Sequence, residues 1–194
     1  IIVSTEEMKN SDDHGTGETN SWKKTIMLYL HDLVYMLAII MVVFLLLFRI
    51  VIVSGSSMYS TLWNGDWLLV TGSVLYHEPE AGDIIVASKD SFNFGEPIIK
   101  RVIATEGQTV DIDFDAGIVY VDGVALQEDY TYTPTNVREG MQFPLTVADG
   151  CLFVMGDNRN RSKDSRNPEI GLVDKREILG KAVFLFLPAA DTDA

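Results

Sequence analysis

The sequence predicts a mostly β fold: an antiparallel β sandwich or partly open barrel, preceded by one N-terminal transmembrane helix. Three observations predict this fold class. A long apolar run lies near the start of the 194-residue chain. Beyond it, short apolar segments alternate with turn residues, and helical periodicity is scarce. The residues after the run, about 140, are enough for one hydrophobic core, so we expect a single domain.

The first two segments differ in polarity. Residues 1–25 are polar and carry several acids, which is typical of a flexible tail. Residues 33–48 are uninterruptedly apolar, and an extension back to Ile26 provides the roughly 20 residues that cross a bilayer as a helix. The apolar run is longer than the core of a cleavable signal peptide. Residues 26–50 are therefore interpreted as an uncleaved signal anchor.

The charged residues suggest how the chain is oriented in the membrane, and they argue against one class of partner. Lys23 and Lys24 precede the predicted anchor, whereas only Arg49 closely follows it. Because positive charge is retained on the cytoplasmic side, we expect a cytoplasmic N-terminus and a domain on the opposite face. The chain has 28 Asp and Glu against 15 Lys and Arg, which argues against nucleic acid as a partner. Contact with a bilayer is expected to be chiefly apolar.

The domain, residues 51–190, contains six apolar runs of strand length. Their length and flanking turn residues predict strands at 67–70, 84–87, 98–103, 118–121, 152–155 and 182–187. Asp122-Gly123 follows the fourth of these runs and strongly predicts a two-residue hairpin turn. Asn64-Gly65, between the apolar pairs 62–63 and 67–68, is a second hairpin candidate.

Ser57 and Lys100 are residue types that can act together in catalysis. Ser57 lies in SGSSMYSTL and Lys100 in PIIKRVIA. A serine hydroxyl is a weak nucleophile unless a base removes its proton, and a neutral lysine amine can be that base. Lowering a lysine pKa by about three units corresponds to about 4 kcal/mol, which burial can supply. Strand alternation would place Lys100 on one face with Ile98 and Val102.

A third motif lies downstream of the two segments that contain Ser57 and Lys100. GDNRNRSKDSR, residues 156–166, follows an apolar run that ends at Met155. Read in chain order, SGSSM around Ser57, GDII at 82–85, KRVI from Lys100 and GDNRxxSxDSR resemble the sequence boxes of bacterial type I signal peptidases. These enzymes are membrane-anchored serine proteases that remove signal peptides from exported proteins. The resemblance runs from about residue 33 to 186 and implies the same β fold.

The resemblance implies a role for each motif residue. Ser57 would be the nucleophile that forms the acyl-enzyme, and Lys100 would be its general base. Ser162 would hydrogen-bond the lysine amine and orient it. The other polar residues of the third motif would support the site, with an ion pair beneath it and a turn that presents Ser162: Asp164 with Arg166, and Asp157 with Asn158.

The resemblance also implies the substrates and the setting. Secretory preproteins would bind through their signal peptides and be cut after small residues of the Ala-x-Ala type. Met58 and Ile99 are candidates for the aliphatic pocket walls, with ordinary core packing as the alternative. The domain would face outward from a bacterial cell membrane, with the lipid bilayer as a partner. No cofactor is implied, and no paired His or Cys spacing suggests a metal site.

Two positions near Ser57 depart from the family pattern, and so does the segment 104–108, which stands where the family usually has G-x-P-G-D. Gly55 stands where some relatives supply a side-chain donor to the oxyanion, so Ser56 or a backbone group would have to assist the Ser57 N–H. Ser60 stands where the family usually has proline, which would stiffen the turn after the nucleophile. We interpret the chain as a divergent but active member.

Other schemes fit the sequence less well. A Ser-His-Asp triad needs a histidine in the domain, and only His77 qualifies, in a segment that predicts an exposed loop. Cys151, the only cysteine, begins an apolar strand and is expected to pack rather than react. A self-cleaving repressor relative would share the Ser/Lys pair but would carry a DNA-binding N-terminus. An anchored β domain that binds exported proteins without cutting them is the remaining alternative.

Overall fold

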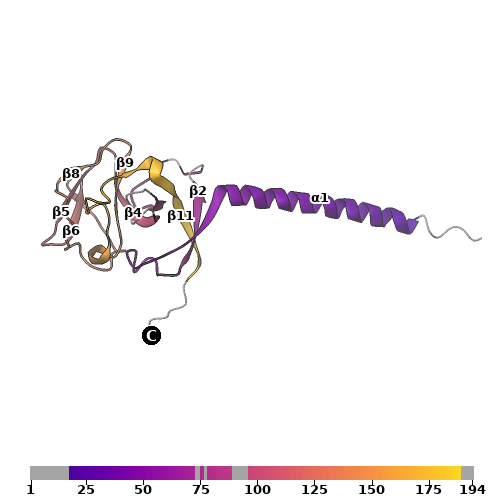
Figure 1. Cartoon of the computed structure of the whole chain (residues 1–194), viewed down its shortest axis with the longest axis horizontal. Coiled ribbons are helices and arrows are strands. Elements are labelled where there is room, and N and C mark those ends of the chain that lie inside the picture. Colours follow the sequence, from indigo (N-terminus) through magenta and orange to yellow (C-terminus); the bar gives the residue numbers. More distant parts are fainter. Residues whose placement is uncertain (1–17, 73–74, 77, 89–95, 189–194) are drawn as a thin grey trace, which may run out of the picture. The chain divides into compact units, whose positions relative to one another are not determined.

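The computed structural model describes residues 18–72, 75–76, 78–88 and 96–188. Most of the predicted polar tail lies outside these residues, and so does His77. The chain separates into two compact units, residues 1–44 and 45–194. The first unit contains most of one helix, and the second contains all the described strands (Figure 1).

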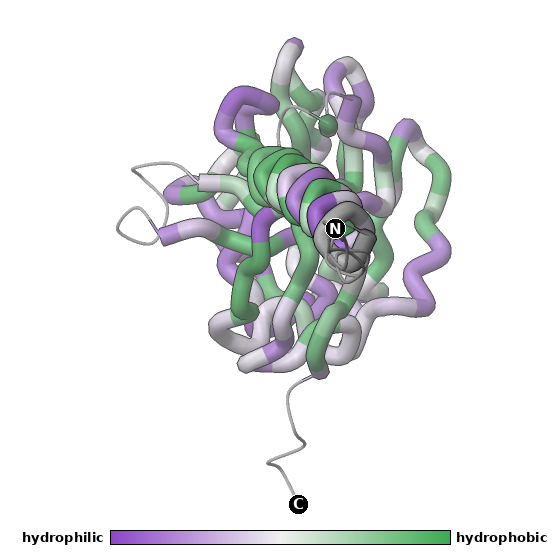
Figure 2. The backbone as a smooth tube through the Cα atoms, turned by 90° about the vertical axis from the view of Figure 1, so that its right-hand side faces the viewer, coloured by the Kyte–Doolittle hydropathy of each residue, from purple (hydrophilic) through white to green (hydrophobic). Residues whose placement is uncertain are grey.

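Helix α1 (Glu18–Leu47) is apolar around its whole circumference over residues 33–47. Its segment Trp22–Leu47 is long and apolar enough to cross a membrane, and the most apolar 18-residue stretch within it has a mean hydropathy of 2.5 and is 0% buried. Figure 2 shows most of the helix in the hydrophobic colour. A helix without a polar face belongs in an apolar medium. The helix ends before the predicted anchor does, because residues 48–50 already belong to the first strand.

The larger sheet has seven strands in the spatial order β1-β2-β11-β3-β4-β9-β10. Every pair of neighbouring strands is antiparallel. In chain order the strands are β1 (Phe48–Ile52), β2 (Trp67–Gly72), β3 (Ile84–Ala87), β4 (Ile98–Thr105), β9 (Cys151–Met155), β10 (Val173–Asp174) and β11 (Ile178–Leu187). Strand β4 lies inside this sheet, since Lys100 pairs with Ile85 of β3 and Val102 with Val154 of β9.

The smaller sheet has four antiparallel strands in the order β7-β6-β5-β8. They are β5 (Thr109–Asp113), β6 (Ile118–Val121), β7 (Val124–Ala125) and β8 (Leu145–Thr146). Figure 1 shows β5, β6 and β8 at the opposite end of the strand unit from β2 and β11. Asp122 and Gly123 join β6 to β7 with φ values of 52° and 78°, and a type I′ turn requires two positive values. The hairpin predicted here is confirmed.

The two antiparallel sheets confirm the mostly β prediction. Each of the six predicted runs lies within a strand, and neither described sheet closes into a barrel. The hairpin candidate at Asn64-Gly65 is wrong, because residues 62–63 form no strand and β2 pairs with β1 instead. This turn closes back on the end of β1: Gly65 N–H donates to Val53 O, and Val53 N–H donates to Asp66 O.

Apolar side chains fix the segment between β1 and β2 onto the sheet. Met58 and Leu62 from this segment are buried in a cluster with Val70 of β2 and Val86 of β3. Burying one such side chain contributes roughly 1.5–3 kcal/mol. Two further clusters fill the space around the smaller sheet and around β9. The described elements also include two short 3₁₀ helices, η2 (Arg159–Arg161) and η3 (Lys175–Glu177).

Candidate active site

Ser57 and Lys100 lie side by side. Lys100 is on β4, and Ser57 is in the turn that follows β1. Lys100 Nζ donates one hydrogen bond to Ser57 Oγ at 2.8 Å and another to Ile99 O at 3.0 Å. A base and a nucleophile exchange a proton at about 2.6–3.2 Å between heavy atoms. The two side chains that the sequence analysis paired are therefore within reach of one another.

The environment of Lys100 favours its uncharged form. The residue is 4% exposed, and its strand neighbours Ile98 and Val102 pack in an apolar cluster. Burial lowers the pKa of Lys100 to about 8, although the carboxylates of Asp164 and Asp157 act in the opposite direction. With that pKa, about a tenth of the side chain is neutral at pH 7. The amine can therefore accept a proton near neutral pH.

The turn that carries Ser57 is held by the third motif and by the core. Asn158 donates its backbone N–H to Ser57 O at 2.9 Å and its side-chain Nδ2 to Ser56 O at 3.0 Å. On the other side, Leu62 N–H donates to Met58 O at 2.9 Å, which closes a helical turn directly after the serine. Because Met58 is buried, rotation of this turn would expose an apolar side chain.

Gly55 is required for its backbone conformation. Its φ is 93°, a value that favours glycine, although no heavy atom lies within 4 Å of the position that a Cβ would take. Its N–H donates to Asn64 Oδ1 at 2.9 Å, so it is already used within the turn. Among the described residues, none accepts a backbone hydrogen bond from the Ser57 N–H, which leaves that donor for an oxyanion.

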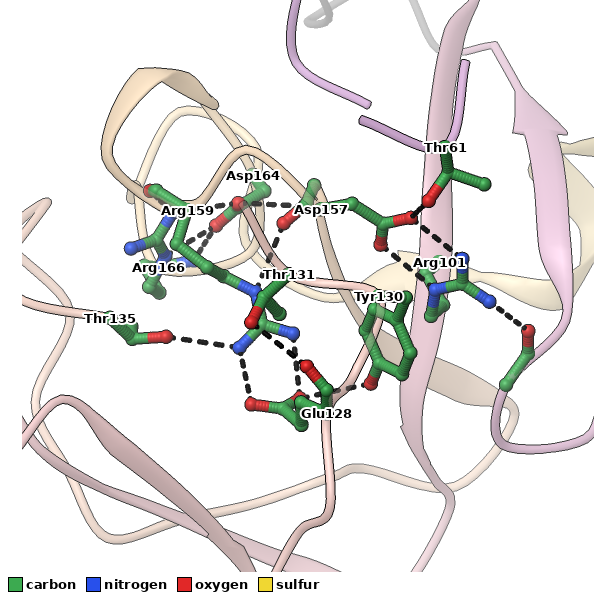
Figure 3. Close-up of polar contacts among 12 residues, drawn as sticks. Thr61, Arg101, Glu128, Tyr130, Thr131, Thr135, Asp157, Arg159, Asp164 and Arg166 are labelled. Carbon is green, nitrogen blue, oxygen red and sulfur yellow. Dashed lines mark hydrogen bonds and ion pairs between the residues drawn. The ribbon is translucent and has the colours of Figure 1, made fainter. Parts of the chain in front are cut away.

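Asp157 joins three segments around the dyad (Figure 3). Arg101 Nε and Nη2 donate to its two carboxylate oxygens at 2.8 and 2.6 Å. Thr61 Oγ1 also donates to this carboxylate at 2.5 Å. A bidentate arginine–carboxylate pair fixes both distance and orientation. The buried Asp157 therefore connects the third motif to strand β4 next to Lys100 and to the turn after Ser57.

Asp164 and Arg166 form a fully buried ion pair. Arg166 Nε and Nη2 donate to the Asp164 carboxylate at 2.8 and 2.9 Å. Asp164 also accepts the Gly156 N–H at 3.0 Å, and Arg166 Nη2 donates to Arg159 O at 2.5 Å. These bonds fold the third motif back on itself. Buried charges need such partners, since an unpaired charge in the interior costs several kcal/mol.

Ser162 lies in the interior near the nucleophile turn. It is 1% exposed, and its Oγ has no hydrogen-bond partner among the described residues. A Cβ on Gly156 would come within 2.2 Å of Ser162 Oγ and 2.4 Å of Ser57 O, which shows how closely these segments approach. The hydrogen bond expected between Ser162 and Lys100 is not formed here, and the amine bonds to Ser57 and Ile99.

Sequence reasoning missed a second bidentate pair next to the site (Figure 3). Arg159 donates from Nη1 and Nη2 to the Glu128 carboxylate at 2.7 and 2.6 Å, and from Nε to Gly156 O at 3.0 Å. Tyr130 lies 4.0 Å below the Arg101 guanidinium, measured to the ring centroid. No motif includes Glu128 or Tyr130, because their contacts depend on the folded chain and not on sequence spacing.

A groove of about 530 Å³ opens beside the dyad. Both predicted wall residues line it: Met58 is also a core residue, whereas Ile99 is half-buried. Most of the remaining lining comes from residues 51–56, which run from the end of β1 to Ser57, and from residues 96–98, which lead into β4. Within the described part of the chain, no group of three His, Cys, Asp or Glu side chains could hold a metal ion.

Comparisons with known proteins agree with this geometry. A family described as signal peptidase, peptidase S26, matches residues 26–187. A probable signal peptidase I-1 from Synechocystis sp. (strain ATCC 27184 / PCC 6803 / Kazusa) is 41% identical over 145 residues, covering 71% of this chain and 70% of the relative. A signal peptidase I from Bacillus licheniformis is 34% identical over 189 residues, covering 92% of this chain and 95% of the relative. The chain therefore belongs to the peptidase S26 family of signal peptidases.

Proposed function

We propose that this chain is a membrane-anchored serine endopeptidase that removes N-terminal signal peptides from secreted preproteins by acylation of Ser57. The observation that carries the proposal is the buried Lys100 amine, 2.8 Å from Ser57 Oγ and with its pKa lowered to about 8. A lysine in water would be protonated and unable to act as a base at neutral pH. Family membership supports the same class of reaction.

The proposed reaction has two halves. Neutral Lys100 takes the Oγ proton while Oγ attacks the scissile carbonyl carbon, and the Ser57 N–H stabilises the oxyanion. The resulting lysine ammonium then gives its proton to the leaving amine, which departs as the new N-terminus of the mature protein. In the second half, Lys100 takes a proton from water while the oxygen of that water attacks the acyl carbon. The bond from this carbon to Oγ then breaks, the lysine ammonium returns the proton to Oγ, and the signal peptide leaves with a new C-terminal carboxyl group. Serine and neutral lysine are regenerated.

The motif residues around the dyad have supporting roles in this proposal. Asp157 connects the third motif to the turn after Ser57 through Thr61 and to β4 through Arg101, and the Asp164–Arg166 pair keeps the third motif folded on itself. Ser162 would receive the amine after Lys100 leaves Oγ, because its buried hydroxyl is without a partner among the described residues. A hydroxyl in that position would hydrogen-bond the lysine ammonium, which would otherwise be a buried charge without a partner.

The groove suggests how cleavage after small residues is achieved. Met58 and Ile99 present aliphatic surface beside Ser57 and Lys100, and Val51 and Val53 extend it along the end of β1. An Ala-x-Ala sequence buries little side-chain volume, so shallow apolar walls suit it. The lack of a side chain at Gly55 leaves the Ser57 N–H as the principal oxyanion donor in this scheme.

Apolar surface supports a location at the bacterial cell membrane. The side chains of residues 22–44 of α1 are exposed, and so are Ile50 and Ile52 of β1 and Trp67 of β2. A lipid bilayer would cover such surface. The Lys23 and Lys24 charges favour a cytoplasmic N-terminus and an extracellular domain. The net charge of −13 argues against nucleic acid as a partner.

The proposal is tested with the full chain in detergent micelles and a purified preprotein. We expect cleavage after the small residue at the signal-peptide boundary, and its loss in Ser57→Ala and in Lys100→Met. Ser60→Ala is the matched control, because Ser60 is exposed and lies in the same turn. Full turnover in either dyad variant would refute the assigned roles, and intact preprotein with the unmodified chain would favour a binding domain.

A further inference from the structure

Two basic side chains stand at the edge of the groove beside the dyad. Arg161 and Lys163 both line it and both are exposed. Ser162 between them has extended backbone angles, φ −119° and ψ 123°, so its two neighbours point to the side opposite its own side chain. Because Ser162 points into the interior, Arg161 and Lys163 project together into the mouth of the groove. We call this pair the cationic rim.

Contacts within the protein leave most of the charge of the cationic rim available to a ligand. Among the described residues, none forms an ion pair with Arg161. Lys163 pairs with Glu169, but their side chains are 48% and 72% exposed, and an exposed pair contributes about 1 kcal/mol or less. The remaining charged lining residue besides Lys100 is Glu96, which lies two residues before β4 and not in the third motif.

The buried carboxylates nearby do not cancel this positive charge. Asp157 and Asp164 are each bound by an arginine inside the protein. The chain as a whole carries a net charge of −13, which repels acidic peptides at long range. A local positive charge at the mouth of the groove therefore discriminates between ligands that reach it, and a carboxylate is the complementary group.

The chemistry of preproteins identifies which segment can supply that carboxylate. A signal peptide has a positive n-region, an apolar h-region and small residues before the cut. The segment of a preprotein that freely carries Asp or Glu is the mature chain after the cut. We infer that the cationic rim binds an acidic side chain within the first few mature residues, so that acidic mature N-termini are processed faster. This inference rests on the proposed function and adds a specificity to it.

The test uses preproteins that differ only at the second mature residue, as Asp, Asn or Lys. With the full chain in neutral detergent, we expect kcat/KM to be highest for Asp and lowest for Lys, with about a threefold to tenfold range for exposed charges. Arg161→Glu should reverse the order, and Lys163→Glu should weaken the preference for Asp. Raising NaCl to about 0.5 M should shrink the range, since the Debye length falls well below 10 Å.

Arg176→Glu is the matched control. It makes the same change in net charge at an 89% exposed side chain that does not line the groove, so the substrate order should stay unchanged. If Arg161→Glu leaves the order unchanged while cleavage continues, the inference is overturned and the proposed function stands. If charge dependence appears only on vesicles that contain anionic lipid, the rim binds headgroups and the inference is likewise overturned.

A binding measurement separates this inference from the proposed function. The Kd of the three preproteins for the Ser57→Ala variant reports the charge preference without any cleavage. Tighter binding of the Asp preprotein, lost when Arg161→Glu is added, supports the rim even if the chain cuts nothing. Equal Kd values for all three preproteins, together with equal kcat/KM values, would overturn the rim.

Discussion

The buried lysine should destabilise the fold that it serves, and Lys100→Met measures that effect. Burial lowers the pKa of Lys100 from 10.5 to about 8. Below pH 8 the side chain is protonated in both the folded and the unfolded chain, so the folded state bears the full penalty. Between pH 8 and 10.5 the unfolded chain binds more protons than the folded chain, and stability rises with pH. Above 10.5 both states are neutral and the penalty is gone.

The magnitude follows from the same two values. A difference between a pKa of 10.5 in the unfolded chain and about 8 in the folded chain corresponds to a free energy of about 3 kcal/mol at 25 °C. Methionine has a similar length and no charge, so Lys100→Met removes this penalty and also removes the hydrogen bonds to Ser57 and Ile99. Those bonds contribute about 1 kcal/mol each. We therefore expect the inactive variant to be more stable than the natural chain at pH 7, by about 1 kcal/mol or more.

The dependence of this stability difference on pH is the sharper test. Thermal melting of both full chains in the same neutral detergent should show the natural chain gaining about 2.5 kcal/mol on the variant between pH 7 and pH 10. For a domain of this size that is roughly 5–10 °C. Lys163→Met is the control, because an exposed lysine should give a constant difference. A constant difference for Lys100→Met as well would refute the buried, neutral lysine.

Three further predictions follow from the contacts of the site. We expect kcat/KM to rise about tenfold per pH unit and to level off near pH 8, and a flat profile would contradict Lys100 as the base. Glu128→Gln should lower the unfolding free energy by about 2–4 kcal/mol because Arg159 is buried, whereas Glu169→Gln, at 72% exposure, should have little effect by denaturant titration. Gly156→Ala should reduce turnover more than 100-fold, since its Cβ would meet Ser57 O at 2.4 Å; near-normal kinetics would show that the turn can shift.

Strand positions could be predicted where turn residues bound an apolar run. The hairpin at Asp122-Gly123 is such a case, because only that turn chemistry accommodates two positive φ values. Strand β1 was missed for a physical reason. Its residues, Phe48–Ile52, continue the apolar run of α1 without a break, so hydrophobicity alone does not mark where the helix ends. The end of the helix is set instead by the antiparallel pairing of Phe48–Ile52 with Trp67–Gly72.

The site was predictable to the extent that local sequence encodes it. The alternation along β4 anticipated that Lys100 shares an apolar face with Val102, and the structure places both in the interior. The Glu128–Arg159 pair could not be anticipated, because it joins segments 31 positions apart through a loop without strand periodicity. Long-range polar contacts of this kind are set by tertiary packing.

The arginines of the site explain how a lysine can lose its proton beside two carboxylates. Burial has the largest effect on the pKa of Lys100 and lowers it, whereas the carboxylates of Asp164 and Asp157 raise it. Each is bound by an arginine, and the Arg166 charge itself lowers the lysine pKa. A guanidinium stays charged at any pH that the fold survives, so this compensation does not titrate away. Burial remains the largest influence on the pKa of Lys100, and the Arg166 charge opposes part of the effect of the carboxylates.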